Sequence, residues 1–238
     1  MCHIRQLGIA DLELILDLQS RIHAALPHES VFQLSTREFI AYCLSDGGRC
    51  YGATWRGETV AYRMVYFPRA REFNLAKDTA LPPSEHGRVA HWDTIAVLPA
   101  WRGFGISRLL NARALTDLAR TDIRHLFATS SPRNSHGVRT LLATGFRPIR
   151  MVEKFGGKLR FLLYRPYPAE WGPPEDDGLL MLDLRATKEL AAAFEAGWAG
   201  SAITIGAGGS WLSMRRHSLP FGNGRPDRTA ASRQEAPS

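Results

Sequence analysis

The sequence has few cysteines, few lysines and no long hydrophobic run. Its three cysteines, Cys2, Cys43 and Cys50, are irregularly spaced, so we expect neither a disulfide framework nor a cysteine-based metal site. No apolar stretch approaches the roughly 18 residues that a membrane-spanning helix needs, and the N-terminus lacks the apolar core of a signal peptide. These absences predict a cytoplasmic protein without a membrane partner and without a metal.

Acidic residues are also in the minority. The sequence holds 23 acidic residues against 30 lysines and arginines, for a formal net charge of +7, and most of the basic residues are arginine. Part of the excess lies in residues 215–238, which contain five arginines against two acidic residues. The charge left on the body is modest for a nucleic-acid-binding protein, so we do not expect nucleic acid as a partner, but it favours an anionic ligand.

The most informative stretch is a strand, a tight turn and the start of a helix. An apolar run over residues 94–98 predicts a buried strand that ends at Pro99. Gly103 and Gly105 then precede a helix, whose first backbone N–H groups have no intrahelical partner and lie at the positive end of the helix dipole. Such a turn suits a phosphate or pyrophosphate. We expect the apolar side of this helix to consist of Leu109, Leu110, Ala114 and Leu118.

Two common phosphate-binding motifs do not occur at this turn. The sequence has no G-x-x-x-x-G-K-[ST] run, and Arg108 replaces the third glycine of the G-x-G-x-x-G fingerprint. Residues 102–107, with the sequence RGFGIS, instead resemble the acyl-CoA loop of the GNAT superfamily of N-acyltransferases, whose pattern is Q/R-x-x-G-x-G/A. Ser107 departs from this pattern, but serine is small enough to fit and its hydroxyl can donate to a phosphate.

A second segment carries the same resemblance. Residues 134–146 are similar to the GNAT pattern N-x-x-A-x-x-L-Y-x-x-x-G-F, with Asn134, Gly145 and Phe146 at matching spacing. Leu141 stands where the family often has a tyrosine that protonates the departing CoA thiolate. The resemblance places Asn134 beside the pantetheine arm of the donor, and a simple helix N-cap is an equally good interpretation of this residue.

The order of elements predicted from hydrophobic periodicity, β-α-α-β-β-β-α-β-α-β-β, is that of the GNAT fold. The resemblance covers residues 1–167 and implies an α/β fold, a central mixed, twisted sheet flanked by helices. We expect a small C-terminal extension of unknown role at 168–214 and a disordered basic tail at 215–238.

The polar segment Pro68–Gly87 predicts a functional loop or partial disorder, and Ser35–Glu38 matches a capping box. The expected strands are 4–7, 50–55, 59–67, 88–98, 125–130, 146–152, 159–165 and 179–184, the helices are about 11–25, 36–45, 105–120, 134–145 and 187–198, and residues 203–214 are left unassigned.

The resemblance implies acetyl-CoA or another acyl-CoA as cosubstrate. Backbone N–H groups of the strand would hold the pantetheine and the thioester, and those of the loop would hold the pyrophosphate. The donor-binding residues implied in this way are Ile95, Ala96, Val97, Arg102, Gly103, Phe104, Gly105, Ile106, Ser107, Arg108 and Asn134.

His91 and Asp93 are the candidate catalytic residues, and strand alternation places both on one face. Histone acetyltransferases of the family carry a glutamate base at the position of His91, and serotonin N-acetyltransferase is similar in having histidine at both positions. A histidine that titrates near neutral pH suits the removal of a proton from an amine, and Asp93 would orient it or attract a cationic amine. The alternative is that His91 packs in the sheet and Asp93 makes a structural hydrogen bond.

The general acid and the acceptor pocket are less clearly marked. Leu141 cannot donate a proton, but a thiol pKa of about 8.5 makes the thiolate a tolerable leaving group that water can protonate. Tyr164 and His136 are candidate substitutes, for which structural roles are the simpler explanation. His28 and Glu29 lie where GNAT enzymes usually shape the acceptor pocket, or in a solvated loop.

We therefore expect an N-acetyltransferase that moves an acetyl group from acetyl-CoA to a primary amine, on a small-molecule acceptor, with His91 as general base. One alternative is transfer of a longer acyl chain from acyl-CoA or an acyl-carrier protein to an amino acid, for which Pro68–Gly87 would make room. Another is a CoA-sensing module without turnover, suggested by Leu141. The sequence identifies neither the acceptor nor the oligomeric state, so a homodimer stays open.

Overall fold

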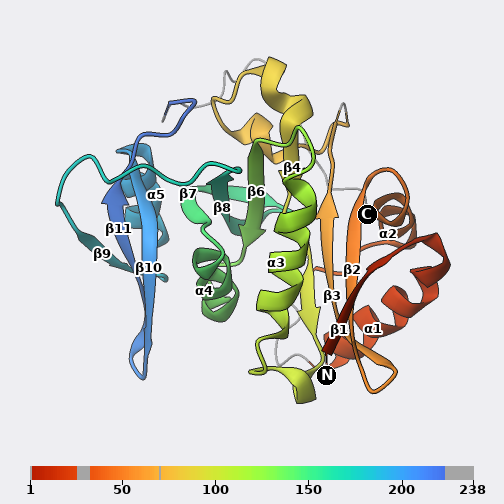
Figure 1. Cartoon of the computed structure of the whole chain (residues 1–238). Coiled ribbons are helices and arrows are strands. Elements are labelled where there is room, and N and C mark those ends of the chain that lie inside the picture. The colour runs from red at the N-terminus through yellow and green to blue at the C-terminus, as the bar shows by residue number, and fades with distance from the viewer. Residues whose placement is uncertain (1, 26–32, 70, 223–238) are drawn as a thin grey trace. The chain divides into compact units, whose positions relative to one another are not determined.

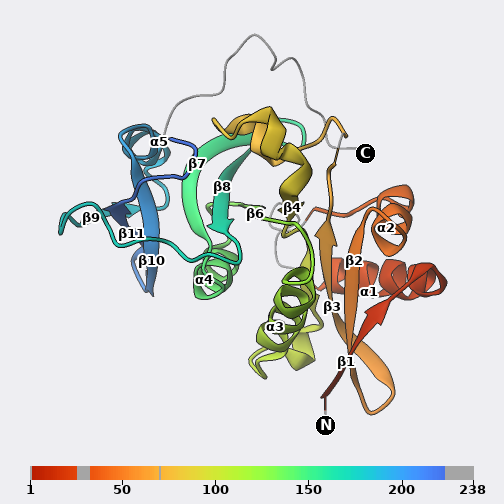
Figure 2. The ribbon, with the colours of Figure 1, turned by 45° about the horizontal axis from the view of Figure 1, so that its top comes forward.

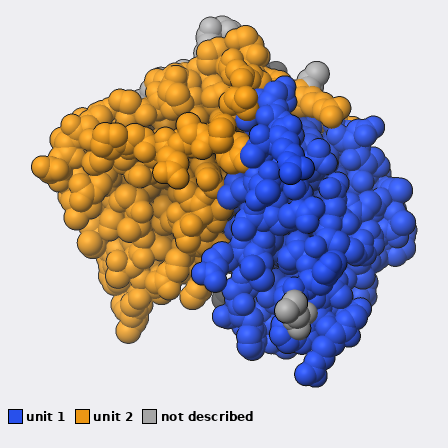
Figure 3. All heavy atoms as spheres, in the orientation of Figure 1, with its two compact units in different colours: residues 1–68, 90–123, 237–238 blue, residues 69–89, 124–236 orange. Residues whose placement is uncertain are grey.

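The computed structural model describes residues 2–25, 33–69 and 71–222. The chain divides into two compact units, coloured separately in Figure 3: of the described residues, unit 1 comprises 2–25, 33–68 and 90–123, and unit 2 comprises 69, 71–89 and 124–222. His28 and Glu29, and residues 223–238 of the predicted tail, lie outside the described residues. Within the described ranges, no helix is both long and apolar enough to cross a bilayer.

The fold is α/β, with a central mixed sheet and flanking helices, as the sequence predicts (Figure 1). In unit 1, β1 (Cys2–Leu7), β2 (Gly48–Trp55) and β3 (Glu58–Tyr66) pair antiparallel in chain order. Arg56 and Gly57 close the β2–β3 hairpin with φ angles of 48° and 86°, which are the left-handed conformations that a two-residue hairpin turn favours. The predicted hairpin is therefore confirmed.

The single strand expected over residues 88–98 is instead broken into β4 (Val89–His91) and β5 (Ile95–Val97). Both pair with β3, where His91 lies opposite Tyr66 and Ile95 lies opposite Arg63. Three residues, 92–94, therefore face only two residues of β3, which is the register of a β-bulge. The backbone N–H of Met64 donates to the carbonyl of Thr94 at 2.7 Å and keeps the bulged segment on the sheet.

Three helices flank the sheet of unit 1: α1 (Leu12–Ala24), α2 (Arg37–Leu44) and α3 (Ile106–Leu118). The Arg63 side chain contacts Asn111 of α3, whereas the Tyr66 ring packs 5.1 Å from Phe39 of α2. Since residues three apart on a strand point to opposite faces, α3 covers one face of β3 and α2 covers the other (Figures 1 and 2).

Two sequence expectations about these helices are wrong in detail. The N-cap of α2 is Thr36, whose Oγ1 accepts from the N–H of Phe39 at 3.2 Å, so the box that Ser35 and Glu38 would form is not used. In α3, Leu109 is 44% exposed. The buried apolar residues of the helix recur every four positions from its first residue, which turns Leu109 outward. The buried residues of α3 are Ile106, Leu110, Asn111, Ala114 and Leu118.

Unit 2 contains β6 (His125–Ser130), β8 (Lys158–Pro166) and β7 (Arg147–Lys154), which pair antiparallel in that order. The helix α4 (Ser135–Ala143) follows β6. The β7–β8 turn has three consecutive positive φ angles, 53° at Phe155, 74° at Gly156 and 81° at Gly157. Both strands and the turn agree with the sequence prediction within two residues at each end.

The polar segment before β4 is an ordered part of unit 2 wherever it is described. It forms two short 3₁₀ turns, Leu75–Asp78 and Pro83–Arg88, and buries Leu81. Lys154 of β7 pairs with Asp78 at 2.8 Å. The described part of this segment is therefore ordered and packed against β7.

The C-terminal extension folds into a second, three-stranded sheet and one helix. Its strands lie in the order β10, β11, β9. The unassigned residues of the sequence analysis form the end of β10 and most of β11. The ring of Phe194 packs edge-on against Phe161 of β8 at 6.0 Å, so the extension shares the core of unit 2. The elements are β9 (Leu180–Asp183), α5 (Thr187–Glu195), β10 (Trp198–Gly206) and β11 (Gly209–Arg216).

The two leucines of α3 give a test of which side of the helix is buried. Replacing Leu110, which is fully buried, by alanine is expected to lower the free energy of unfolding by about 2–5 kcal/mol through lost burial and a cavity. Leu109→Ala is the matched control, with an expected change within about 0.5 kcal/mol. Urea unfolding of both variants measures this, and equal losses would contradict the observed orientation of α3.

Candidate active site

The predicted phosphate loop lies in unit 1 between β5 and α3. After β5 the chain makes a 3₁₀ turn, Pro99–Trp101, and Gly105 then occupies the N-cap of α3. Gly103 and Gly105 have φ angles of 85° and 73°. Residues other than glycine rarely adopt this backbone conformation. A Cβ atom built on either glycine would meet nothing within 4 Å, so the space above both is open to a ligand.

The amide groups of this loop are available at the start of the helix. Arg108 and Leu109 are the first residues whose N–H groups bond back to the Gly105 carbonyl, at 3.0 and 3.2 Å. The amides before them belong to the set that a helix leaves without intrahelical acceptors. The side chains add positive charge near these amides, because residues 94–116 include three arginines and no acidic residue. The loop is thus arranged to receive an anion.

Side chains around the loop hold it against the neighbouring strands. Arg102 donates from Nε to the carbonyl of Val97 at 3.2 Å, which ties the loop to the end of β5. Trp101 packs between Trp55 and Phe104, with ring centroids 5.4 and 6.4 Å away. Phe104 is nevertheless 73% exposed. The sequence analysis missed the Trp55 contact because nothing in the local pattern connects the β2–β3 hairpin with this loop.

The candidate catalytic residues lie at the bulge: His91 directly precedes it, and Asp93 is its middle residue. His91 is the last residue of β4 and only 1% exposed, with its ring edge-on to Tyr66 at 5.1 Å. Asp93 keeps part of its surface exposed, and its carboxylate accepts a hydrogen bond from the Thr94 hydroxyl at 2.8 Å. Desolvation raises the pKa of Asp93, while the Thr94 hydrogen bond and the charge of Arg63 oppose this rise.

Arg63 is a member of this neighbourhood that the sequence analysis did not single out. Its side chain is completely buried, and its Nε and Nη2 atoms donate to Asn111 Oδ1 at 3.0 and 2.8 Å. The guanidinium also lies 4.5 Å from the ring centre of Trp92, the first residue of the bulge. Burial lowers the pKa of Arg63 to about 9. An arginine inside an apolar strand was the available signal.

Asn134 lies in unit 2, at the N-cap of α4, where its Oδ1 accepts from the N–H of Gly137 at 2.9 Å. A Cβ atom on residue 137 would lie 2.4 Å from Asn134 Nδ2. The cap therefore needs the glycine that this chain carries where the family pattern has alanine. The geometry supports the N-cap role of Asn134 directly.

The two substitute acids also belong to unit 2. The Tyr164 hydroxyl lies 3.0 Å from His125 Nδ1, and His125 Nε2 lies 3.3 Å from Glu85. Tyr164 is fully buried, and desolvation raises its pKa above the usual value for tyrosine. His136 is exposed on α4. Tyr164 is thus engaged in a buried hydrogen-bond network within its own unit.

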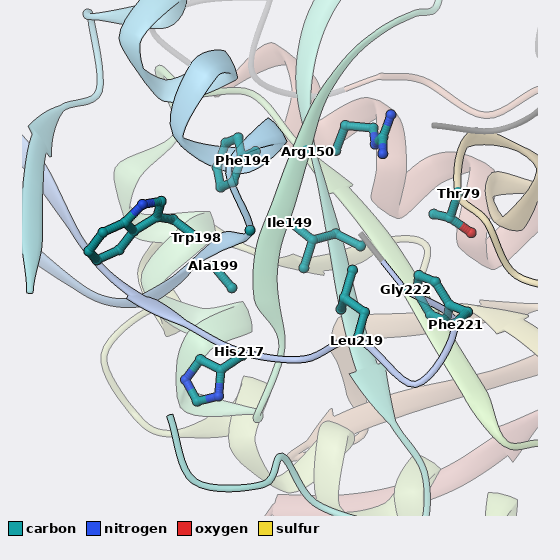
Figure 4. Close-up of a pocket in the computed structure, with 11 residues that line it drawn as sticks. Thr79, Ile149, Arg150, Phe194, Trp198, Ala199, His217, Leu219, Phe221 and Gly222 are labelled. Atoms are coloured by element: carbon teal, nitrogen blue, oxygen red, sulfur yellow. The ribbon is translucent and has the colours of Figure 1, made fainter. Parts of the chain in front are cut away.

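Unit 2 also contains a pocket that none of the predicted site residues lines (Figure 4). Its lining comes from β7, from the segment that follows α5 and from the segment that follows β11. It combines apolar side chains with two basic ones. Its lining includes Ile149, Phe194, Trp198, Leu219, Phe221, Arg150 and His217. Among the described residues, no cluster of histidine, cysteine and acidic side chains has the makings of a metal site.

The model of the acetyltransferase (GNAT) family matches residues 13–146, which is more than half of the chain and includes the phosphate loop, the bulge and Asn134. The chain belongs to the GNAT family. No curated protein sequence matches it significantly. Membership in this family makes the chain an acyl-CoA-dependent transferase.

Solved GNAT structures share the fold at low sequence identity. An Arabidopsis thaliana NAA60 in complex with acetyl-CoA aligns with a TM-score of 0.55 at 15% identity, over 71% of this chain and 100% of that one. The aminoglycoside acetyltransferase AAC(6')-Ib in complex with coenzyme A and kanamycin aligns with a TM-score of 0.52 at 17% identity, over 70% and 95%. The Escherichia coli ribosomal-protein-S18-alanine N-acetyltransferase aligns with a TM-score of 0.50 at 15% identity, over 75% and 100%.

The left-handed N-cap of this GNAT protein can be tested by adding one methyl group. Gly105→Ala is expected to destabilise the fold by about 1–2 kcal/mol, because alanine resists a positive φ. It is also expected to weaken acetyl-CoA binding about tenfold or more by displacing the loop amides. Calorimetric titration and urea unfolding measure the two effects.

Gly8→Ala is the control for this change. A Cβ atom on Gly8 also meets open space, but its φ of −127° suits any residue. The control variant should bind and unfold like the parent protein. If Gly105→Ala also left donor binding unchanged, the loop would not hold the donor.

Proposed function

We propose that this GNAT protein transfers an acetyl group from acetyl-CoA to the primary amine of a small-molecule acceptor. The observation that carries the proposal is the loop at the start of α3, where two left-handed glycines leave open space above the first amides of the helix. The anionic pyrophosphate of CoA suits that position, since residues 94–116 carry arginines and no acidic residue. Backbone N–H groups of residues 95–97 would hold the pantetheine and polarise the thioester.

The transfer would occur in one direct attack. The amine lone pair forms a bond to the thioester carbonyl carbon, a tetrahedral intermediate collapses, and the carbon–sulfur bond breaks with both electrons on sulfur. The amine proton passes to His91 as the general base. Asp93, the more exposed of the pair, would attract the cationic form of the acceptor before it loses its proton.

The departing thiolate does not require an acid from the protein. Leu141 offers no proton, and Tyr164 donates to or accepts from His125 inside unit 2. A free thiol has a pKa of about 8.5, so CoA leaves as a thiolate that solvent water can protonate near neutral pH. We propose residues 1–167 as the transferase domain and 168–214 as its extension.

Variants of His91 separate catalysis from packing. His91→Phe keeps an aromatic ring against Tyr66 and removes the proton acceptor. We expect it to lower kcat about a hundredfold or more, the usual contribution of a general base, while the Kd for acetyl-CoA changes less than about threefold. The measurements are steady-state kinetics over a panel of amines, with release of CoA as the signal, and calorimetric titration with acetyl-CoA.

Full activity of His91→Phe would show that His91 only packs in the sheet, as the alternative interpretation has it. Acetyl-CoA binding without CoA release over the whole amine panel would favour a CoA-binding module instead. Palmitoyl-CoA serves as the comparison donor, and a preference for it would favour longer-chain transfer.

A further inference from the structure

Phe104 is the most exposed large apolar side chain among the described residues. It is 73% exposed, against 43–56% for the other exposed members of this class. It stands between Gly103 and Gly105, whose left-handed backbone fixes the loop on both sides of it. A single exposed apolar side chain is common on protein surfaces and needs no explanation. Phe104, however, is the outer end of a row of aromatic rings.

Two tryptophan rings continue the row behind Phe104. The Phe104 ring centre lies 6.4 Å from that of Trp101, and the Trp101 ring centre lies 5.4 Å from that of Trp55. Both tryptophans are partly buried. Trp55 ends β2, and Trp101 ends the 3₁₀ turn after β5. The row therefore connects the β2–β3 hairpin with the phosphate loop, and it supports the Phe104 ring from one side while most of that ring faces solvent.

Positive charge accompanies the exposed ring. Arg102 and Arg108 flank Phe104 in the sequence, and both are exposed. Within the described parts of the chain, none of the ion pairs involves either arginine. The hydrogen bond from Arg102 to the Val97 carbonyl uses Nε at 3.2 Å, so the two Nη atoms are not needed for it. An aromatic face with guanidinium groups beside it suits a nucleotide, whose base stacks and whose phosphates accept hydrogen bonds.

Coenzyme A carries both of the groups that this surface fits. Its adenosine is joined to the pyrophosphate through the ribose, so a pyrophosphate on the first amides of α3 keeps the adenine within one sugar of the loop. The adenine has a flat π face, and stacking of a base on an aromatic side chain strengthens binding. The pantetheine on the other side of the pyrophosphate is aliphatic and has no such face. The exposed ring therefore suits the nucleotide half of the donor.

We propose that the Phe104 side chain is a stacking platform for the adenine of acetyl-CoA, held in place by Trp101 and Trp55. Arg102 and Arg108 are the cations assigned to the 3′-phosphate of the same nucleotide. This role rests on the proposed function in one respect, the binding of the pyrophosphate by the loop. It goes beyond the backbone contacts of that loop, because it gives side chains the selection of CoA over a pantetheine compound without a nucleotide.

The test separates the two halves of the donor. Calorimetric titration compares CoA with 4′-phosphopantetheine, which keeps the pantetheine and one phosphate but lacks the adenosine. Phe104→Leu should weaken CoA binding about tenfold, which is within the range for one lost base–aromatic stack. The same variant should change the Kd for 4′-phosphopantetheine by less than about twofold. Phe104→Trp keeps an aromatic face, so its Kd for CoA should stay within about threefold of that of the parent protein.

Two more variants serve as controls. Leu109→Ala removes another exposed apolar side chain, 44% exposed, from the start of the same helix. It has no aromatic face, so both Kd values should stay as in the parent protein. Trp55→Leu removes the far end of the row without altering the loop, and it should weaken CoA binding less than Phe104→Leu does.

The adenine can also be observed directly in the complex by proton NMR. Stacking on an aromatic ring moves the adenine H2 and H8 resonances upfield through the ring current. Both should move upfield when CoA binds to the parent protein or to Phe104→Trp, and much less when it binds to Phe104→Leu. This measurement needs neither an acceptor nor turnover.

Adenine shifts that are the same with the parent protein and with Phe104→Leu would overturn the proposal. So would an equal loss of affinity for CoA and for 4′-phosphopantetheine in that variant. Upfield shifts that disappear in Phe104→Leu, in a protein that acetylates no amine, would retain the platform and reject the transfer reaction. Turnover whose KM for acetyl-CoA is unchanged in Phe104→Leu would do the reverse.

Discussion

The start of α3 is the constraint on which the proposed donor site depends. A helix that begins directly after a strand can aim its first amides at a ligand only if the connecting backbone turns sharply. Here Gly103 and Gly105 make that turn in left-handed conformations, with φ angles of 85° and 73°. Side chains at these positions would resist the turn and fill the space above it. The dipole of α3 and the acid-free sequence around it then add a positive field at the same point.

The bulge between β4 and β5 is the second feature on which the proposed function depends, because the two proposed catalytic residues lie at it. Its extra residue lies between His91 and Ile95, which both pair with β3, and Asp93 stands in the middle of the bulge with part of its surface exposed. Burial of Arg63 beneath this segment has a cost, which two hydrogen bonds to Asn111 and the Trp92 ring offset.

Local sequence signals predicted most of the elements, and tertiary contacts decided the rest. Arg56-Gly57 is sufficient to locate a hairpin, and the Asn134 cap needs only residues up to Gly137. The bulge was not predictable, because its register depends on β3 residues about thirty positions earlier. Arg63 was missed for the same reason, since Asn111 lies on another element. Residues 203–214 were left unassigned because their strand structure depends on pairing: they contribute to β10 and β11, which pair with each other, and β11 also pairs with β9.

The most direct test of the central claim is an NMR titration of the ¹⁵N-labelled protein with acetyl-CoA. If the first turn of α3 holds the pyrophosphate, the amide resonances of Gly103–Arg108 should show the largest saturable shifts, with those of Ile95–Val97 next. Coenzyme A without the acetyl group should reproduce the loop shifts. Saturable binding that leaves the Gly103–Arg108 amides unmoved, or no binding at millimolar donor, would contradict the assignment of this loop as the donor site.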